Sequence, residues 1–249
     1  MKILRIILFL LILNTFVMLG VLFSQPTGKV IQQDKEYANI TKIIDGDTIE
    51  ILLDNITQKV RMLGINTPEK NEKDWEKAKN FLEQFENKTV ELVRSKEDKD
   101  KYNRKLRYIF YNNAFLNKEI LENGWAHFYS YSEDKYTEEL KKAEGRAREN
   151  RIGIWESSKE DCGGCIFLIE LNEIDPGEYI ILGNNCSFDC NLTGWKISDD
   201  SSSHTQKLNF SIFSGGGYRI DYNGSVWNDN GDSLYLRDRE GGLALFYRY

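Results

Sequence analysis

Four short segments of the chain combine residue types that suit one kind of chemistry. They are Asp45–Thr48, Arg61, Asn66–Glu69 and Lys101–Arg104. Together they offer oxygen ligands for a hard cation, a glutamate that can accept a proton, and two arginines whose planar donor groups match phosphate oxygens. A phosphodiester is anionic, so a nucleophile reaches its phosphorus only after this charge is neutralised. The set therefore predicts attack of water on a phosphodiester.

The oxygen ligands come from two of these segments. Asp47 and the Asn66–Thr67 stretch are the candidate ligands for Ca²⁺, a cation that takes carboxylate, amide and carbonyl oxygens. Asp45 lies two residues from Asp47, and strand alternation would put both carboxylates on one face. We therefore expect Asp45 to supply a second negative charge to the cation.

The remaining residues would act on the phosphate and on water. Arg61 and Arg104 stay charged at any working pH, and we expect them to hold the five-coordinate transition state. Glu69 follows a proline that stiffens the turn, which suits a carboxylate that must hold a water molecule as general base.

Short β-rich runs and helical stretches must position these residues. Five strands with helices after the third and the fifth indicate a mainly β fold with helices (α+β), a small barrel of the OB type whose open face commonly holds single-stranded nucleic acid. A turn is expected at Asp54–Asn55. The predicted strands are 38–44, 48–53, 60–64, 89–93 and 106–111, and the predicted helices are 73–86, 114–123 and 134–150.

In the order DGDT, R, TPE and KYxR, these motifs resemble the staphylococcal nuclease (thermonuclease) family over residues 37–155. The resemblance implies a catalytic role for Arg61, Glu69 and Arg104, and metal binding by Asp47, Asn66 and the carbonyl of Thr67. It further implies substrate contacts at residues that match the family's phosphate-binding and base-stacking positions: Lys101, Tyr102, Tyr129 and Tyr131.

Two residues depart from the family pattern. Asn66 stands where the family usually has aspartate, so the site has one negative charge fewer and should bind its metal more weakly. Asn103 replaces a glycine common before the last arginine, but asparagine tolerates the left-handed backbone conformation better than most residues do. We therefore expect Asn66 to be the weak point of the site.

Two functions from different classes remain open at this point. The first is a Ca²⁺-dependent endonuclease that hydrolyses DNA and RNA, with single-stranded or denatured nucleic acid as its partner. The second is a binding module on the same fold that has lost catalysis and only holds nucleic acid or protein. Intact Arg61, Glu69 and Arg104 favour the first function, and Asn66 favours the second.

Beyond Trp155 the helical periodicity disappears and short strands alternate with Gly, Asn and Asp turns. These strands predict an immunoglobulin-like antiparallel β-sandwich. The segment 165–249 resembles the lamin-tail family in Ile169–Glu173, Glu178–Ile180, Asn191–Trp195 and Asn230–Asp238. That resemblance implies attachment or targeting and no catalysis, with an unknown partner. The predicted strands are 166–172, 178–182, 194–197, 217–222, 233–237 and 243–247.

All four cysteines lie at the entrance of this segment, at positions 162, 165, 186 and 190. An even number in an exported chain favours two disulfides, whereas two short-spaced pairs would also suit a structural Zn²⁺. We favour disulfides because most exported proteins fold in an oxidising compartment.

The chain begins with a predicted targeting segment. Lys2 and Arg5 precede an apolar run over 6–23, which is typical of a signal peptide or an uncleaved signal anchor. We expect an extracytoplasmic protein, secreted or held on the membrane by this segment. The predicted organisation is a targeting segment at 1–24, a linker at 25–36, the nuclease-like domain at 37–156, a second linker at 157–164 and the sandwich at 165–249.

The overall charge limits how nucleic acid could be held. The formal net charge is −6, with 39 acidic residues against 33 lysines and arginines. General electrostatic attraction to a polyanion is therefore not expected, and a substrate must be held by a local basic patch. We expect the protein to be a monomer.

Overall fold

The computed structural model describes residues 35–249, except 71, 131, 175–176, 201–203 and 229–230. The predicted targeting segment lies outside the described residues. No helix in the described ranges is long and apolar enough to cross a membrane. The linker predicted at 25–36 ends earlier than expected, because strand β1 begins at Lys35. Glu36 fixes that strand by accepting hydrogen bonds from Lys105 Nζ and Arg107 Nε, each at 2.8 Å.

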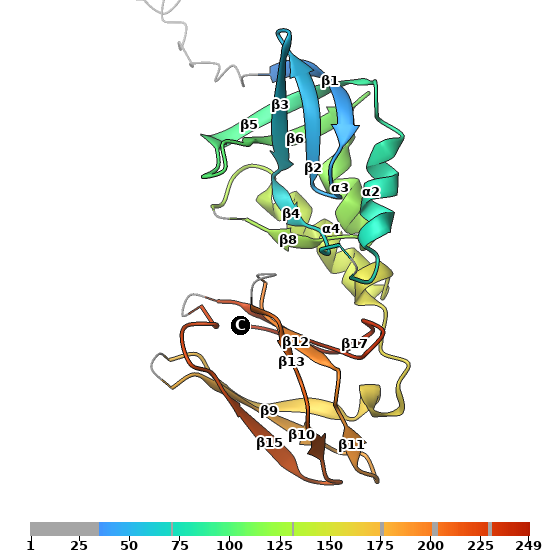
Figure 1. The fold of residues 1–249 in the computed structure, drawn as a ribbon, viewed down its shortest axis with the longest axis vertical. Coiled ribbons are helices and arrows are strands. Elements are labelled where there is room, and N and C mark those ends of the chain that lie inside the picture. The colour runs from blue at the N-terminus through green and yellow to red at the C-terminus, as the bar shows by residue number, and fades with distance from the viewer. Residues whose placement is uncertain (1–34, 71, 131, 175–176, 201–203, 229–230) are drawn as a thin grey trace, which may run out of the picture. The chain divides into compact units, whose positions relative to one another are not determined.

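The first part of the chain forms a closed five-stranded barrel with three helices (Figure 1). Its strands pair in the order β3-β2-β1-β5-β6, all antiparallel, and a parallel pairing of β3 with β6 closes the barrel. The strands are β1 (Lys35–Ile43), β2 (Thr48–Leu53), β3 (Ile56–Met62), β5 (Thr89–Lys99) and β6 (Lys105–Tyr111). The predicted OB-type barrel is confirmed.

Turn residues set the register of the hairpins. Asp54 and Asn55, between β2 and β3, both have positive φ, at 50° and 62°. A two-residue turn with this backbone matches the twist of the flanking strands, and Asp and Asn tolerate it. Thr48 therefore pairs with Arg61, which brings the DGDT segment beside the first arginine.

Three helices cover the barrel, each shorter than predicted: α2 (Trp75–Glu83), α3 (Leu116–Glu122) and α4 (Thr137–Glu149). Their apolar faces join the barrel core through Ala78, Leu82, Ile120 and Leu140, all fully buried. Two residues at the predicted start of α3 instead form strand β7 (Ala114–Phe115), which pairs with β6. Two further strands, β4 (Gly64–Asn66) and β8 (His127–Tyr129), pair only with each other in the described sheets.

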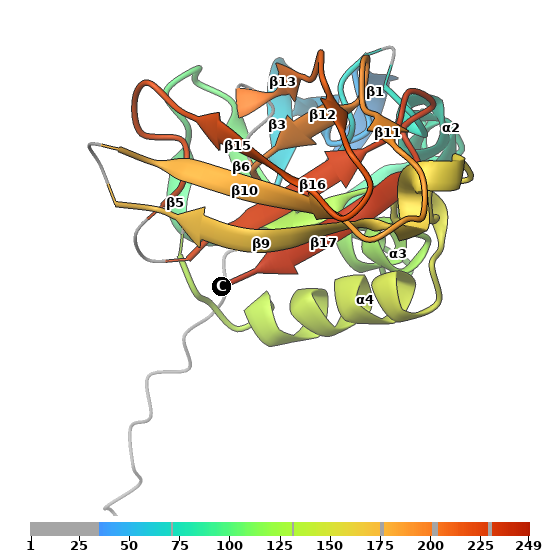
Figure 2. The ribbon, with the colours of Figure 1, turned by 90° about the horizontal axis from the view of Figure 1, so that it is seen from below.

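The C-terminal part consists of short antiparallel sheets, consistent with the predicted sandwich (Figure 2). One sheet has the order β15-β10-β9, a second has the order β13-β12-β16-β17, and β11 pairs with β14. Ile180 and Leu182 of the first sheet and Leu234 and Leu236 of the second share one buried core. The strands are β9 (Ile166–Asn172), β10 (Tyr179–Asn184), β11 (Cys190–Asn191), β12 (Lys196–Ser198), β13 (Gln206–Lys207), β14 (Ser211–Ile212), β15 (Gly217–Asp221), β16 (Ser233–Arg237) and β17 (Leu243–Arg248).

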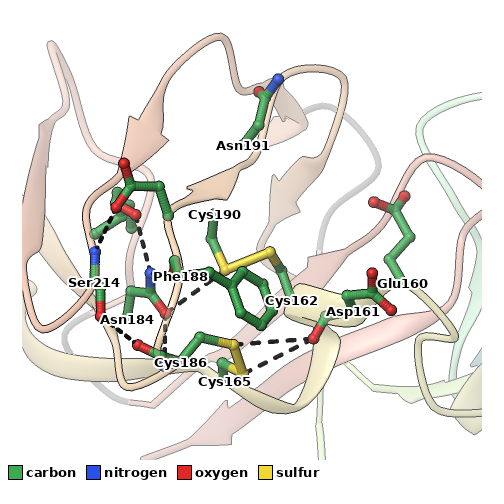
Figure 3. Close-up of a disulfide and its surroundings, with 12 residues drawn as sticks. Glu160, Asp161, Cys162, Cys165, Asn184, Cys186, Phe188, Cys190, Asn191 and Ser214 are labelled. Atoms are coloured by element: carbon green, nitrogen blue, oxygen red, sulfur yellow. Dashed lines mark hydrogen bonds between the residues drawn. A yellow bond between two sulfur atoms is a disulfide. The ribbon is translucent and has the colours of Figure 1, made fainter.

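The four cysteines form two nested disulfides (Figure 3). Cys162 pairs with Cys190 at a Cα–Cα distance of 5.7 Å, and Cys165 pairs with Cys186 at 5.2 Å. Cys162 lies in the short 3₁₀ turn η2 (Asp161–Gly164) and Cys165 directly follows it. The disulfides therefore tie the segment that precedes β9 to the sandwich core. No cluster of three or more His, Cys, Asp or Glu that could hold a metal occurs in the part of the chain that the structure describes.

The barrel and the C-terminal strands also touch through a small apolar cluster. Ile154 and Trp155 lie in the 3₁₀ turn η1 (Gly153–Trp155) and pack with Ala147 of α4 and Tyr235 of β16. His127 of β8 contacts the rings of Trp155 and Tyr235, with centroid distances of 5.0 and 4.4 Å. Burial, with the charges of Arg237 and Arg248, holds the pKa of His127 well below its ordinary value, so this imidazole is neutral.

Candidate active site

Asp47 is held in a tight turn between β1 and β2. Its Oδ1 accepts a hydrogen bond from the Thr48 hydroxyl at 2.9 Å, and its Oδ2 accepts one from the Thr67 N–H at 3.3 Å. The turn requires glycine at position 46, because a Cβ there would lie 2.7 Å from the Cβ of Ala78. Local packing of the turn against α2 thus aims the Asp47 carboxylate at the strand that carries Asn66.

Arg61 brings two predicted ligands together. Its Nη2 lies 3.1 Å from Asp47 Oδ2 and 3.3 Å from Asn66 Oδ1, and its Nη1 donates to the Met62 carbonyl. The side chains of Arg61 and Asp47 are only 15% and 13% exposed, so their ion pair is partly shielded from water. Two oxygens from segments far apart in sequence therefore converge on one positively charged group.

Arg104 follows a loop that fixes its direction. Asp100 accepts hydrogen bonds from the Arg104 backbone N–H at 2.9 Å and from its Nε at 2.7 Å. Burial would raise the pKa of Asp100, but these bonds outweigh it and lower the pKa, so the carboxylate stays charged. Asn103 has φ 64°, the left-handed conformation predicted for it. Arg104 Nη1 also reaches the Thr48 hydroxyl at 3.5 Å, which links it to the Asp47 turn.

Arg61 and Arg104 line one cleft on the barrel, which also includes Tyr129 of β8. Three acids also line the cleft, Glu97, Asp100 and Asp134, and Asp134 accepts hydrogen bonds from Ser95 at 2.6 Å and Tyr108 at 2.7 Å. Two arginines on one concave surface suit an anion with several oxygens. The cleft is therefore the candidate site for a phosphodiester.

Glu69 lies beside this arrangement and does not line the cleft. It follows β4 in an exposed turn, where its backbone N–H donates to Glu72 Oε2 at 2.9 Å and its carbonyl accepts from the Glu72 N–H. Glu72 thus fixes the backbone of the turn. The structure brings Asp47, Arg61, Asn66 and Thr67 into contact, and Glu69 follows Thr67 by two residues.

The role predicted for Asp45 rested on a strand that does not form. Residues 44–47 lie in a turn between β1 and β2, so alternation does not apply to them. Asp45 Oδ1 instead accepts hydrogen bonds from the Gly46 N–H and from Trp75 Nε1, both at 2.8 Å. Asp45 therefore anchors helix α2 to the turn, and the expectation that it shares a face with Asp47 was wrong.

The predicted substrate contacts have different outcomes. Tyr102 is 68% exposed, and the Lys101 ammonium and the Arg104 guanidinium lie over its ring at 5.2 and 5.4 Å. Tyr129 is half-buried at the cleft. Tyr131 lies outside the described residues.

Sequence reasoning missed three residues that shape the cleft: Thr48, Asp100 and Asp134. Thr48 was named only as part of the DGDT motif, yet its hydroxyl links Arg104 to Asp47. Asp100 directly precedes the KYxR motif and could have been suspected as the partner of Arg104. Asp134 was named only as the first residue of a predicted helix, where it makes local hydrogen bonds with Tyr136 and Thr137. Its bonds from Ser95 of β5 and Tyr108 of β6, which place it at the cleft, have no local signal.

The donor set fits a hard cation, although with a single carboxylate. Asp47, Asn66 and the Thr67 carbonyl supply only oxygen atoms, which Ca²⁺ prefers. Asp47 Oδ2 and Asn66 Oδ1 both lie within 3.3 Å of Arg61 Nη2, so they already stabilise one positive charge between them. These residues could therefore hold a calcium ion.

Comparison with known proteins agrees with this architecture. Residues 59–157 match the family model described as staphylococcal nuclease homologue, a range that includes Arg61, Asn66, Glu69 and Arg104 but not Asp47. Among relatives, the thermonuclease of Staphylococcus intermedius is 32% identical over 125 residues, which covers 47% of this chain and 74% of that protein. The chain belongs to the staphylococcal nuclease family.

Two other relatives extend the comparison. An uncharacterized protein of Methanocaldococcus jannaschii is 34% identical over 162 residues, covering 53% of this chain and 78% of that protein. The thermonuclease of Staphylococcus hyicus is 26% identical over 159 residues, covering 59% of this chain and 94% of that protein. The nucleases among these relatives support a nucleic-acid hydrolase.

Proposed function

We propose that this protein is an exported, Ca²⁺-dependent nuclease that hydrolyses phosphodiester bonds of single-stranded or denatured DNA and RNA. The observation that carries the proposal is the placement of Arg61 and Arg104 on one cleft, with Asp47 and Asn66 in contact with the first arginine. Family membership and the nucleases among the relatives support the class of reaction. Calcium and export rest on the donor set and on the sequence.

In this proposal, different residues bind the metal and the phosphate. Asp47, Asn66 and the Thr67 carbonyl would hold calcium, which would supply neutralisation of charge on the phosphate. Arg104, oriented by Asp100, donates to phosphate oxygens and stabilises the charge that grows on them in the transition state. Arg61 does the same from β3, because Asp47, Asn66 and the Met62 carbonyl use only part of its donor group.

Glu69 is proposed to act as the general base. Its turn is fixed through Glu72, and its carboxylate is exposed, so water reaches it freely. A carboxylate that accepts a proton from an attacking water typically contributes 10²–10⁴-fold to a rate. The structure shows Glu69 outside the cleft lining, so this role requires substrate to extend beyond the two arginines.

The second part of the proposal concerns location and the C-terminal strands. Two disulfides are typical of proteins that fold in an oxidising compartment, which supports export and an extracytoplasmic site, secreted or held by residues 1–24. We propose that residues 165–249 form a lamin-tail-like domain that attaches the nuclease to an unidentified partner. The nuclease domain proposed at 37–156 extends to Lys35, where β1 begins, and the second domain stays proposed at 165–249; we propose a monomer.

One experiment tests the reaction and the base together. The protein is incubated with denatured DNA in calcium or in chelator, beside a Glu69→Gln variant and a Glu83→Gln control that removes an exposed charge from α2. We expect cleavage in calcium alone, a loss of at least 100-fold in Glu69→Gln and wild-type activity in the control. Equal activity of Glu69→Gln and wild type would refute the base. Binding of DNA without any cleavage would favour the alternative, a catalytically inactive binding module, for which the single carboxylate of the metal site is the supporting observation.

A further inference from the structure

Strand β8 contributes Tyr129 to the candidate site, and its sheet pairing alone gives it little stability. It is three residues long and pairs only with β4 in the described sheets, through Gly64–Tyr129, Ile65–Phe128 and Asn66–His127. An isolated two-stranded ribbon is at best marginally stable in water. Because Tyr129 lines the cleft and Asn66 contacts Arg61, the position of this ribbon decides the geometry of the site.

The C-terminal strands contact β8 through Arg237 of β16. Its Nη1 donates to the Ile154 carbonyl at 2.6 Å and to the Gly241 carbonyl at 3.2 Å, and its Nη2 lies 3.4 Å from His127 Nε2. Arginine has only donors, so His127 Nε2 must be the acceptor. Arg237 thereby bridges the end of the barrel chain, the turn between β16 and β17, and His127, the residue directly opposite Asn66.

Arg248 of β17 reaches the same strand through a buried carboxylate. Its Nη1 donates to Glu144 Oε2 at 2.9 Å, and the other oxygen of Glu144 accepts the Phe128 N–H at 2.9 Å. Glu144 is 1% exposed, so its charge needs partners. Arg148 contributes at a longer distance of 3.6 Å. Strand β8 is therefore tied to the C-terminal strands at two adjacent residues, through the imidazole of His127 and the backbone N–H of Phe128.

We propose that the C-terminal β-region is a positioning element of the nuclease site, in which Arg237 and Arg248 hold β8 and, through it, Asn66 and Tyr129. This inference rests on the proposed function and changes the role of the C-terminal region from attachment alone to support of the site. Neither arginine lines the cleft that holds Arg61 and Arg104, and Arg237 lines a separate pocket together with Asn66 and His127, at the end of the β4–β8 ribbon that carries Asn66. The region would then be needed for full activity even where no attachment partner is present.

The test compares Arg237→Met and Arg248→Met in the full chain with Arg219→Met, which removes an exposed arginine that pairs with Asp221 on β15. Hydrogen exchange of the backbone amides, measured without metal, reports the stability of the β4–β8 ribbon directly. We expect the amides of residues 64–66 and 127–129 to exchange about tenfold faster in the first two variants, with α3 unchanged. Exchange equal to that of Arg219→Met would overturn the proposal.

Activity gives a second readout that separates positioning from simple loss of folded protein. The calcium concentration for half-maximal cleavage should rise about fivefold in Arg237→Met and stay constant in Arg219→Met. An irreversibly unfolded fraction lowers the maximal rate and leaves this concentration unchanged, whereas reversible unfolding raises it only by the reciprocal of the folded fraction, which circular dichroism without calcium measures. Unchanged half-saturation in Arg237→Met would count against positioning of Asn66. If the wild type cleaves nothing, the proposed function fails, while the exchange comparison still decides the role of the two arginines.

Discussion

Replacing Asn66 by aspartate should strengthen the metal site, and the structure sets the size of the effect. Asn66 Oδ1 lies 3.3 Å from Arg61 Nη2, so a carboxylate there would gain about 1.3 kcal/mol from the guanidinium at the dielectric constant of water. The same carboxylate at a typical Ca²⁺–oxygen distance of about 2.4 Å would gain roughly 3.5 kcal/mol from the doubly charged ion. Because the site is partly shielded from water, the value for bulk water is a lower limit, and the difference of about 2 kcal/mol corresponds to at least roughly 30-fold tighter calcium binding.

Calorimetric titration of the metal-free protein with calcium measures this directly. The control is Asn112→Asp, which adds the same charge at an exposed turn between β6 and β7, where φ is 48°. Aspartate tolerates that backbone conformation, so the control should fold normally. We expect tighter binding in Asn66→Asp and no change in Asn112→Asp.

Two results would refute the reasoning. Unchanged or weaker binding in Asn66→Asp would show that residue 66 does not contact the metal. An equal gain in both variants would show that long-range charge, and not ligation, strengthens the site. Either result would remove Asn66 from the set of ligands and leave Asp47 and the Thr67 carbonyl as the remaining candidates.

Two further predictions concern the C-terminal strands. The chain-entropy relation assigns about 3.6 kcal/mol to the outer disulfide, with a sequence separation of 28, and about 3.3 kcal/mol to the inner one, with a separation of 21. Because the loops are nested, reduction of both should cost less than the sum; denaturant unfolding followed by tryptophan fluorescence measures this. A mass unchanged by reductant, with bound zinc, would contradict the disulfides. Burial raises the pKa of Asp200 from 3.8 to about 6. The free energy of unfolding of the wild type should therefore fall by up to about 3 kcal/mol as the pH rises from 4 to 6. Asp200→Asn should remove this dependence in unfolding curves at pH 4.5 and 7.5, and parallel losses in both proteins would contradict it.

The strands that the sequence predicted best are those held by local pattern. Thr48–Leu53, Ile166–Asn172 and Ser233–Arg237 have the predicted bounds, because each is a run of β-forming residues that ends at turn signals. Strand β5 extends to Lys99, six residues beyond the predicted end, through a charged stretch with no apolar alternation. Its pairing with β6 overrides that local signal.

The site was predictable where chemistry is carried by short motifs. The two arginines lie on one cleft as expected, and Asn103 adopts the predicted left-handed conformation. The expectation for Asp45 was wrong because a tight turn, and not a strand, forms there. The turn depends on the packing of Gly46 against Ala78, and only the packing of α2 reveals it. The β4–β8 ribbon was missed because strands of three residues have no periodicity to detect.

Arg237 and Arg248 show most clearly why sequence alone could not define the extent of the site. On their strands they resemble ordinary surface charges, and no motif marks them. Their structural role depends on partners distant in sequence: the neutral imidazole of His127 and the buried carboxylate of Glu144. Removing one partner of a buried ion pair typically costs 3–5 kcal/mol, because the remaining charge is left in an environment that water does not reach. Without Arg248, Glu144 would keep only Arg148 at 3.6 Å, so we expect this buried carboxylate, and the β8 backbone that it binds, to be less stable in Arg248→Met.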